Sequence, residues 1–340
     1  MIRYPRPLTD GDVVAVTSPS AGVGPTLLPR LEVALTAVRA AGFRTTVGEL
    51  MSGDGIASGP ADARAAELQR LLTDPEVRAV VPPWGGEIAL DLLGRLDWDA
   101  IGADPTWLVG FSDISTLLLP LTLRTGVATL HGQNLLDTPY APPPGVARWL
   151  DVVRTPSGGT VEQRSPGRHR AQGYDDWERH PEVDVLMLDT AGSWTRLDAD
   201  GPVEVTGRLV GGCLETVAHL AGPPFGDVPG FAAAHAPEGL VVYLECAESN
   251  AADTTRRLLG LRYAGWFDAA TAVLVGRTRG ADLPGWTQHD AVRHALGDLG
   301  VPVLADVECG HVPPHLALVN GALATVRHDA DASTITQVLR

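Results

Sequence analysis

Residues 108–113 read Leu-Val-Gly-Phe-Ser-Asp, and the expected architecture follows from this stretch. An apolar run ends in Gly-Phe-Ser-Asp and passes directly into the helical pattern of residues 114–123. A serine at such a strand-to-helix turn presents its hydroxyl at the tip of a sheet, beside the positive N-terminus of the helix. Ser112 is therefore a candidate nucleophile. The alternative is a structural N-cap, because Ser followed by Asp is also ordinary helix-start chemistry.

Strand and helix patterns alternate through the first half of the chain. Strands are predicted at 13–16, 77–81 and 107–110, and helices at 27–41, 61–72, 88–96 and 114–123. This alternation predicts an α/β fold, in which a parallel sheet is covered by helices on both faces. The functional loops of such a sheet lie at the carboxyl ends of its strands.

The length of 340 residues exceeds what one hydrophobic core usually serves and indicates two domains. We assign residues 1–140 to an N-terminal domain that carries Ser112. Residues 141–202, rich in proline and polar side chains, are expected to form a linker with substrate loops. Residues 203–340 are expected to form a smaller mixed α/β domain. Its strands are predicted at 205–209, 240–244, 273–275 and 301–304, its helices at 214–220, 251–259 and 287–299, and its last segments at 316–326 and 335–339.

Charge and hydropathy restrict the partners of the protein. The formal net charge of −15 leaves no basic patch that would neutralise phosphates, so nucleic acid and anionic membrane are not expected as partners. The N-terminus shows no apolar signal segment, and no apolar run reaches the length of a membrane span. We expect a cytoplasmic protein.

Two residue types exclude further classes of chemistry. All 26 basic residues are arginine, so Schiff-base chemistry, a P-loop lysine and a Ser-Lys dyad are excluded. The three cysteines are an odd count in a long chain, which argues against a disulfide framework and for buried thiols.

Two further segments place a reactive residue at a rigid position. Glu245 follows the apolar strand 240–244, where a buried carboxylate can orient an imidazole or serve as a salt-bridge partner. His311 lies in a turn made rigid by Gly310, Pro313 and Pro314. Metal binding by His311 and His315 is disfavoured, because the two prolines forbid the helix that an i, i+4 pair requires, and we expect no metal or other cofactor.

Ser112, Glu245 and His311 together predict a catalytic triad. Serine would attack a carbonyl, histidine would move the proton, and glutamate would stabilise the imidazolium. Backbone N–H groups of Gly86 and Asp113 are the candidates for the oxyanion hole, although the glycines at 85 and 86 could also serve only the turn. The chain order matches α/β-hydrolases, but residue 114 is isoleucine where their Gly-x-Ser-x-Gly elbow has glycine.

The chain resembles the LD-carboxypeptidase family of serine peptidases, and within it the branch of the microcin C self-immunity peptidase. The matching motifs occur in the family's order over nearly the whole chain: Ser18-Pro19-Ser20, Trp84-Gly85-Gly86-Glu87, Gly110-Phe111-Ser112-Asp113-Ile114, His131-Gly132, Trp194, Gly207-Arg208-Leu209-Val210-Gly211-Gly212, Leu244-Glu245, Val275-Gly276-Arg277 and Gly310-His311.

This resemblance implies a flavodoxin-like N-terminal domain with the serine, a C-terminal domain with Glu and His, and an active site between them, usually in a homodimer. It implies cleavage of an amide bond in a small peptide or an aminoacyl-nucleotide conjugate, as in microcin-type immunity or detoxification. The alternatives are a murein tetrapeptide LD-carboxypeptidase and a non-catalytic binding protein on the same scaffold.

The resemblance also implies substrate-binding positions, which are Gly85, Glu87, Trp177, Trp194, Cys213 and Ser249. The two tryptophans could stack on a ligand or only anchor the linker. Cys213 replaces the asparagine of the family's Gly-Gly-Asn-Leu, and Ser249 replaces a lysine that the immunity branch often carries. These two departures leave the triad chemistry unchanged but affect the expected substrate.

Overall fold

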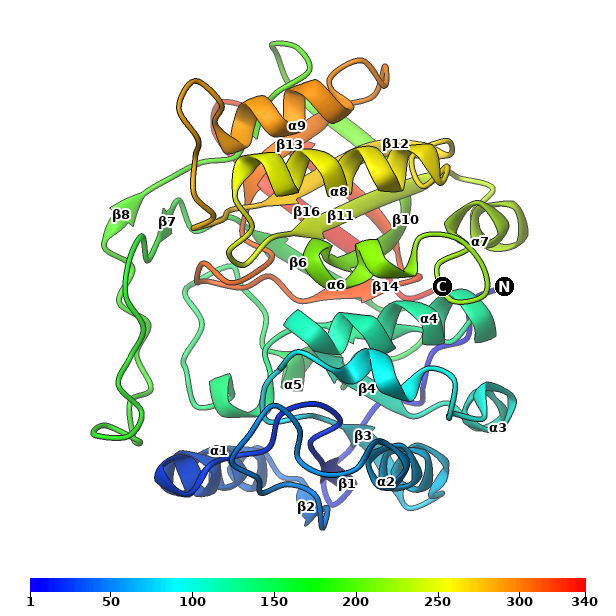
Figure 1. The fold of residues 1–340 in the computed structure, drawn as a ribbon, viewed down its shortest axis with the longest axis vertical. Helices are drawn as coiled ribbons and strands as arrows, with labels where there is room; N and C mark the ends of the chain where they lie inside the picture. The colour runs from blue at the N-terminus through cyan, green and yellow to red at the C-terminus, as the bar shows by residue number, and fades with distance from the viewer.

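The six-stranded sheet carries the turn that contains Ser112. The computed structural model describes residues 1–340, and the strands of this sheet follow the order β14-β5-β4-β3-β1-β2 (Figure 1). The strands are β1 Val13–Val16, β2 Arg44–Val47, β3 Val77–Val80, β4 Trp107–Gly110, β5 Thr129–His131 and β14 Leu318–Asn320. β1 to β5 pair in parallel and β14 runs antiparallel to β5. The order β2-β1-β3-β4-β5 is flavodoxin-like and confirms the predicted fold class.

Helices cover both faces of this sheet because its central strands are apolar on both sides. The helices are α1 Leu28–Ala40, α2 Ala61–Thr73, α3 Trp98–Ala103 and α4 Ser115–Thr125. Val14 and Val16 of β1 belong to the same core cluster as α1, whereas Val13 and Ala15 belong to that of α2. This alternation along one strand is what a sheet buried on both faces requires.

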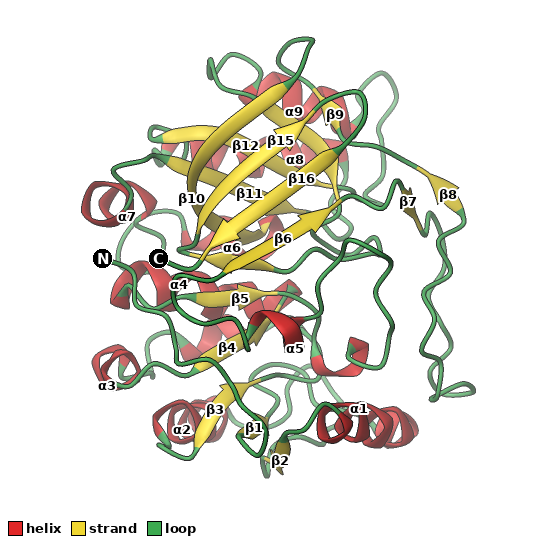
Figure 2. Ribbon diagram, turned by 180° about the vertical axis from the view of Figure 1, so that it is seen from behind, coloured by secondary structure: helices red, strands yellow, loops and turns green.

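The second sheet has eight strands in the order β6-β16-β15-β10-β11-β12-β13-β9. They are β6 Thr160–Arg164, β9 Thr195–Arg196, β10 Val203–Cys213, β11 Leu240–Glu245, β12 Ala270–Gly276, β13 Val303–Val307, β15 Leu323–His328 and β16 Ser333–Val338. β10 to β13 are parallel, and the outer strands are antiparallel. α8 Ala251–Tyr263 and α9 Gln288–Leu296 lie side by side over the parallel strands (Figures 1 and 2). The sheet is therefore mixed in strand direction, and with its helices it forms the α/β arrangement predicted for this part of the chain.

Each sheet includes strands from distant parts of the chain. β14, at residues 318–320, joins the six-stranded sheet, while β6 and β9 come from the segment 141–202 and join the eight-stranded sheet. The same segment contains α5 Trp149–Val152 and the short strands β7 Arg168–His169 and β8 Thr190–Ala191, which pair at the base of an extended arm (Figure 2). Both sheets thus depend on residues from more than one of the predicted segments.

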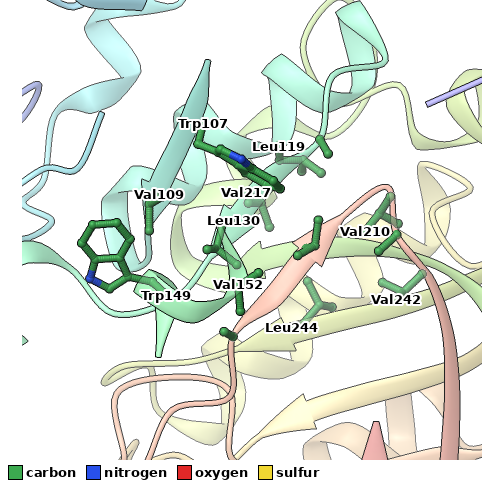
Figure 3. Packing of buried hydrophobic residues seen from close by; sticks show 14 of the residues in the cluster. Trp107, Val109, Leu119, Leu130, Trp149, Val152, Val210, Val217, Val242 and Leu244 are labelled. Atoms are coloured by element: carbon green, nitrogen blue, oxygen red, sulfur yellow. The ribbon is translucent and has the colours of Figure 1, made fainter. Parts of the chain in front are cut away.

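A continuous apolar core joins the two sheets. One cluster of 51 buried residues includes Trp107 and Leu130 of the six-stranded sheet, Val210 and Leu244 of the eight-stranded sheet, and Trp149 of α5 (Figure 3). Because this packing is dense, the carboxyl ends of β4 and β11 are held in fixed relative positions. These strand ends carry the candidate site.

Several local predictions differ from the structure. The helix expected at 88–96 is only a 3₁₀ turn at Ala89–Leu92, and Gly94, a weak helix former, lies inside the predicted range. The strands β2 and β5 and the helices α3 and α7 Val228–His235 were not predicted. The helix expected at 214–220 is the short α6 Leu214–Val217 followed by a 3₁₀ turn.

None of the helices combines the length and the apolar character that crossing a membrane requires. The three cysteines are free and buried, in agreement with the interpretation of their number.

Candidate active site

Ser112 lies in a strained turn at the carboxyl end of β4. Its φ of +63° is unusual for a residue other than glycine, and Gly110 before it has a φ of +152°. A non-glycine residue in this region costs about 1–3 kcal/mol and is typical of functional sites. The N-cap of this turn is Phe111 and that of α4 is Ile114, whereas Ser112 Oγ lies 3.0 Å from Nε2 of His311. The cap alternative is therefore wrong for this serine.

His311 connects Ser112 to Glu245. Its Nδ1 lies 2.8 Å from Glu245 Oε2, and Glu245 is fully buried at the end of β11. Gly310 allows this contact, because a Cβ on residue 310 would lie 2.5 Å from that same carboxylate oxygen. The three predicted triad residues are thus brought together from two sheets.

The Glu245 carboxylate controls the protonation of His311. Burial of the ring lowers the pKa of His311, but the charge and hydrogen bond of Glu245 outweigh burial, so the net pKa lies above its ordinary value of 6.5. A histidine with a raised pKa gains a proton readily, which suits a group that takes the proton of a serine hydroxyl.

The loop 84–87 lies against the serine turn. A Cβ on Gly85 would lie 2.8 Å from Ser112 Oγ, so only glycine leaves the space around the hydroxyl open. The N–H groups of Gly85 and Gly86 have no acceptor in the protein and are free to donate. The Asp113 carboxylate, in turn, accepts from Ser20 Oγ at 2.6 Å and from the Ala89 N–H at 2.8 Å, which ties this loop to the serine turn. Sequence reasoning considered only the backbone of Asp113 and missed this role of its side chain.

Ser112 and His311 open onto a cavity of about 430 Å³. Two of the predicted substrate residues, Gly85 and Trp177, line it. Trp177 belongs to the extended arm, donates from Nε1 to Tyr140 Oη at 2.7 Å and packs against the Arg30 guanidinium. The lining also includes aromatic and charged residues, among them Trp84, Phe111, Asp137, Arg148, Arg170 and Asp175.

The comparisons with known proteins agree with this geometry. Residues 14–132 match the model of the LD-carboxypeptidase N-terminal domain, and residues 206–326 match that of the C-terminal domain. A carboxypeptidase-like protein of Streptomyces coelicolor is 30% identical over 98% of this chain and 95% of its own length. The chain belongs to the LD-carboxypeptidase family. As a member of this family it is a serine peptidase and thus a hydrolase.

The chain is similar both to an immunity protein and to a murein peptide carboxypeptidase. The microcin C7 self-immunity protein MccF of Escherichia coli is 25% identical over 97% of this chain and 95% of its own length. The structure of MccF in its wild-type apo state has a TM-score of 0.80 at 23% identity, covering 98% of each chain. A muramoyltetrapeptide carboxypeptidase from Oxalobacter formigenes has a TM-score of 0.69 at 18% identity, covering 96% of this chain and 98% of its own. At these identities the two structures establish the shared fold.

The other predicted substrate positions lie outside the cavity. Glu87 is exposed beyond the loop that it ends. Trp194 is buried and donates from Nε1 to Glu308 Oε2 at 2.6 Å, so its polar edge is already used within the protein. Sequence reasoning could not separate it from Trp177, because both lie in the same polar segment.

Cys213 and Ser249 surround a buried carboxylate instead of the cavity. Ser249 Oγ donates to Glu215 Oε1 at 2.8 Å, and Cys213 Sγ lies 3.4 Å from Glu215 Oε2. Burial of Glu215 raises its pKa, but hydrogen bonds from the backbone of residues 247–249 and from Ser249 outweigh burial and bring the pKa to about 2. Glu215 thus stabilises the loop that follows Glu245, a role that sequence reasoning missed.

Two further histidines are buried beside the triad, and one of them, His315, also lines the cavity. His131 and His315 stack at 5.1 Å, and neither ring nitrogen of either residue has a hydrogen-bond partner. His131 Nε2 lies 4.0 Å from Glu245 Oε1, which is also unpartnered. Burial, together with the nearby histidines, lowers the pKa of His315 to about 3 and that of His131 well below its ordinary value. Both rings are therefore neutral near pH 7 and add no charge beside His311.

Proposed function

We propose that this protein hydrolyses an amide bond in a small peptide or an aminoacyl-nucleotide conjugate, with Ser112, His311 and Glu245 as its triad. The observation that carries the proposal is the continuous line of contacts from Ser112 Oγ to His311 Nε2, at 3.0 Å, and from His311 Nδ1 to Glu245 Oε2, at 2.8 Å. The line ends at a cavity large enough for a small ligand.

The reaction would proceed in two halves. Ser112 Oγ attacks the carbonyl carbon while its proton passes to His311 Nε2, and the resulting imidazolium is stabilised by Glu245. The C–N bond then breaks, and the same proton passes to the leaving nitrogen. In the second half His311 activates a water molecule, which cleaves the acyl–serine ester and restores the free hydroxyl. No metal takes part in these steps.

The negative oxygen of the tetrahedral intermediate would be stabilised by backbone donors next to the serine. We assign this role to the N–H groups of Gly86 and Asp113, as the sequence suggested. The unpaired Gly86 N–H and the open space at Gly85, against Ser112 Oγ, support the assignment. Each such donor contributes about 10²–10³ in kcat in serine peptidases.

The aromatic lining favours the nucleotide conjugate over the murein peptide. Trp84, Phe111 and Trp177 present flat apolar surface to the cavity, and a nucleobase stacks on such rings. MccF structures in complex with glutamyl sulfamoyl guanosine and aspartyl sulfamoyl adenosine show that a protein of this fold holds such compounds. A murein tetrapeptide has no aromatic group, so it remains the second candidate.

A side-by-side assay separates the candidates. Aspartyl sulfamoyl adenosine and a murein tetrapeptide are incubated with the protein, and the released products are measured by mass spectrometry. We expect sulfamoyl adenosine to be released. Release of D-alanine with the nucleotide compound intact would overturn the preference, and binding of either compound without turnover would identify a non-catalytic binding protein.

The homodimer and the cytoplasmic location remain predictions from the family resemblance and the sequence. Light scattering of the purified protein tests the homodimer directly.

A further inference from the structure

One acidic side chain in the cavity lacks a charged partner. Asp137 ends the 3₁₀ turn at Leu135–Asp137 and lines the cavity together with Ser112 and His311. Its carboxylate is half-buried, forms no ion pair and accepts no hydrogen bond from another side chain; only the backbone N–H of Asn134 donates to it. A carboxylate with free acceptor capacity in a partly closed cavity is costly unless something pairs with it.

The other charged groups of the cavity are already paired. Arg148 Nη2 lies 2.9 Å from Asp151 Oδ1, and Arg170 Nη1 lies 2.8 Å from Asp175 Oδ2. The proposed triad accounts for His311. Asp137 is thus the one carboxylate of the cavity lining that has no cation bound to it.

Arg30 is the nearby cation, but its hydrogen bonds go elsewhere. Its Nε donates to the Leu136 carbonyl at 2.9 Å, and its Nη1 donates to the carbonyls of Pro181 and Val183. Its guanidinium lies over the Tyr140 and Trp177 rings. Arg30 therefore attracts Asp137 only through space.

The pKa of Asp137 is consistent with a missing partner. Burial raises it to about 6, and the positive charge of Arg30 together with the backbone hydrogen bond from Asn134 only partly counteracts burial. A cation placed against the carboxylate would bring the pKa down and recover the energy that burial costs.

We infer that the Asp137 carboxylate binds a protonated amine of the substrate and selects aminoacyl or peptidyl amides that carry a free ammonium group near the scissile bond. This inference rests on the proposed function and narrows its substrate class. The α-ammonium of an aminoacyl group and the side-chain ammonium of a diamino acid share this chemistry. The aromatic rings of Trp84 and Phe111 add favourable surface for a cation in the same cavity.

The test compares two substrates and two variants. Aspartyl sulfamoyl adenosine is assayed beside its N-acetyl derivative, in which the amine is neutral. A hydrogen bond to a charged group contributes enough to change kcat/KM about tenfold to a hundredfold. Asp137→Asn should lower kcat/KM for the free amine by this factor and leave the N-acetyl compound unchanged. The matched control is Asp268→Asn, which removes the same charge from an exposed carboxylate that has no ion pair and lies outside the cavity lining, and it should change neither value.

Two results would overturn the inference. One is an equal loss on both substrates together with a lower melting temperature, which would make Asp137 a counter-ion of Arg30. The other is unchanged kcat/KM of Asp137→Asn on the free amine. If the Asp137→Asn variant does not fold, the wild-type protein is assayed with aspartyl sulfamoyl adenosine and with an analogue in which hydrogen replaces the amino group. Equal kcat/KM for these two compounds would overturn the inference.

Failure of this inference can be distinguished from failure of the proposed function. If the wild-type protein cleaves neither compound, the proposed function fails, and calorimetric affinities decide the inference instead. Tighter binding of the free amine than of the N-acetyl compound would support it, and equal affinities would overturn it.

Discussion

The two sheets supply the candidate site in different ways. The six-stranded sheet presents Ser112 by local means, since β4 ends in Gly110 and the serine itself adopts a positive φ in the turn. The eight-stranded sheet presents Glu245 at a fully buried strand end, and His311 reaches it only because Gly310 allows a close approach. The conformation of the nucleophile is thus set by its own turn, whereas the position of the histidine base depends on contacts between residues distant in the chain.

The largest expected effect comes from removing the group that the six-stranded sheet supplies. Ser112→Ala should lower kcat by about 10⁶, because no other nucleophile lines the reaction centre. Ligand binding measured by calorimetry should persist, as the cavity walls are unchanged. Activity within tenfold of the wild type would remove Ser112 from the role of nucleophile.

Removing the acid from the eight-stranded sheet should have a smaller effect and change the pH profile. Glu245→Gln should lower kcat/KM by about 10⁴. Without the Glu245 charge, burial dominates the pKa of His311, so the acidic limb of the profile should move from above pH 6.5 to below it. The measurement is kcat/KM from about pH 5 to 9.

The double variant sharpens this prediction. If the groups from the two sheets act as one unit, Ser112→Ala combined with Glu245→Gln should be no slower than Ser112→Ala alone. Additive losses would show that the two sheets act independently, contrary to the proposed triad.

Gly310→Ala tests the close approach between His311 and Glu245. The new Cβ would lie 2.5 Å from Glu245 Oε2, so the carboxylate must shift. A displacement of this size typically costs about 10²-fold in rate. The control is Gly94→Ala, where nothing lies within 4 Å of the new Cβ and kcat should stay unchanged. Full activity of Gly310→Ala would mean that the Glu245 contact is not needed.

The smallest effect concerns stability at the boundary between the sheets. The pKa of His315 is lowered to about 3, so between pH 6.5 and 3 the unfolded state binds a proton that the folded state does not. Stability is therefore lost as the pH falls through this window, by about 1.4 kcal/mol per pH unit for one proton. His315→Phe should remove this contribution to the pH dependence of the free energy of unfolding, which is measured by urea unfolding at several pH values. His180→Phe, at an exposed position of the arm, is the matched control. An unchanged slope in His315→Phe would show that the buried ring takes up a proton in the folded state.

The local patterns were sufficient for the strand-to-helix turn and the parallel sheet. Apolar runs at β1, β3 and β4 are buried on both faces, so each run is visible in the sequence. β2 was missed because its residues are mostly exposed and show no apolar pattern. The helix expected at 88–96 is only a 3₁₀ turn at Ala89–Leu92, because the apolar spacing that suggested it ignores the low helix propensity of Gly94.

The order of the residues alone was enough to name Ser112, Glu245 and His311, because each follows an apolar strand or stands in a rigid turn, and these are local properties. Tertiary packing separated Trp177 from Trp194 and moved Cys213 and Ser249 from the cavity to Glu215. Tertiary packing also left the Asp137 carboxylate in the cavity without an ion-pair partner. The physical reason is that burial and pairing depend on neighbours distant in the chain, and no local pattern records them.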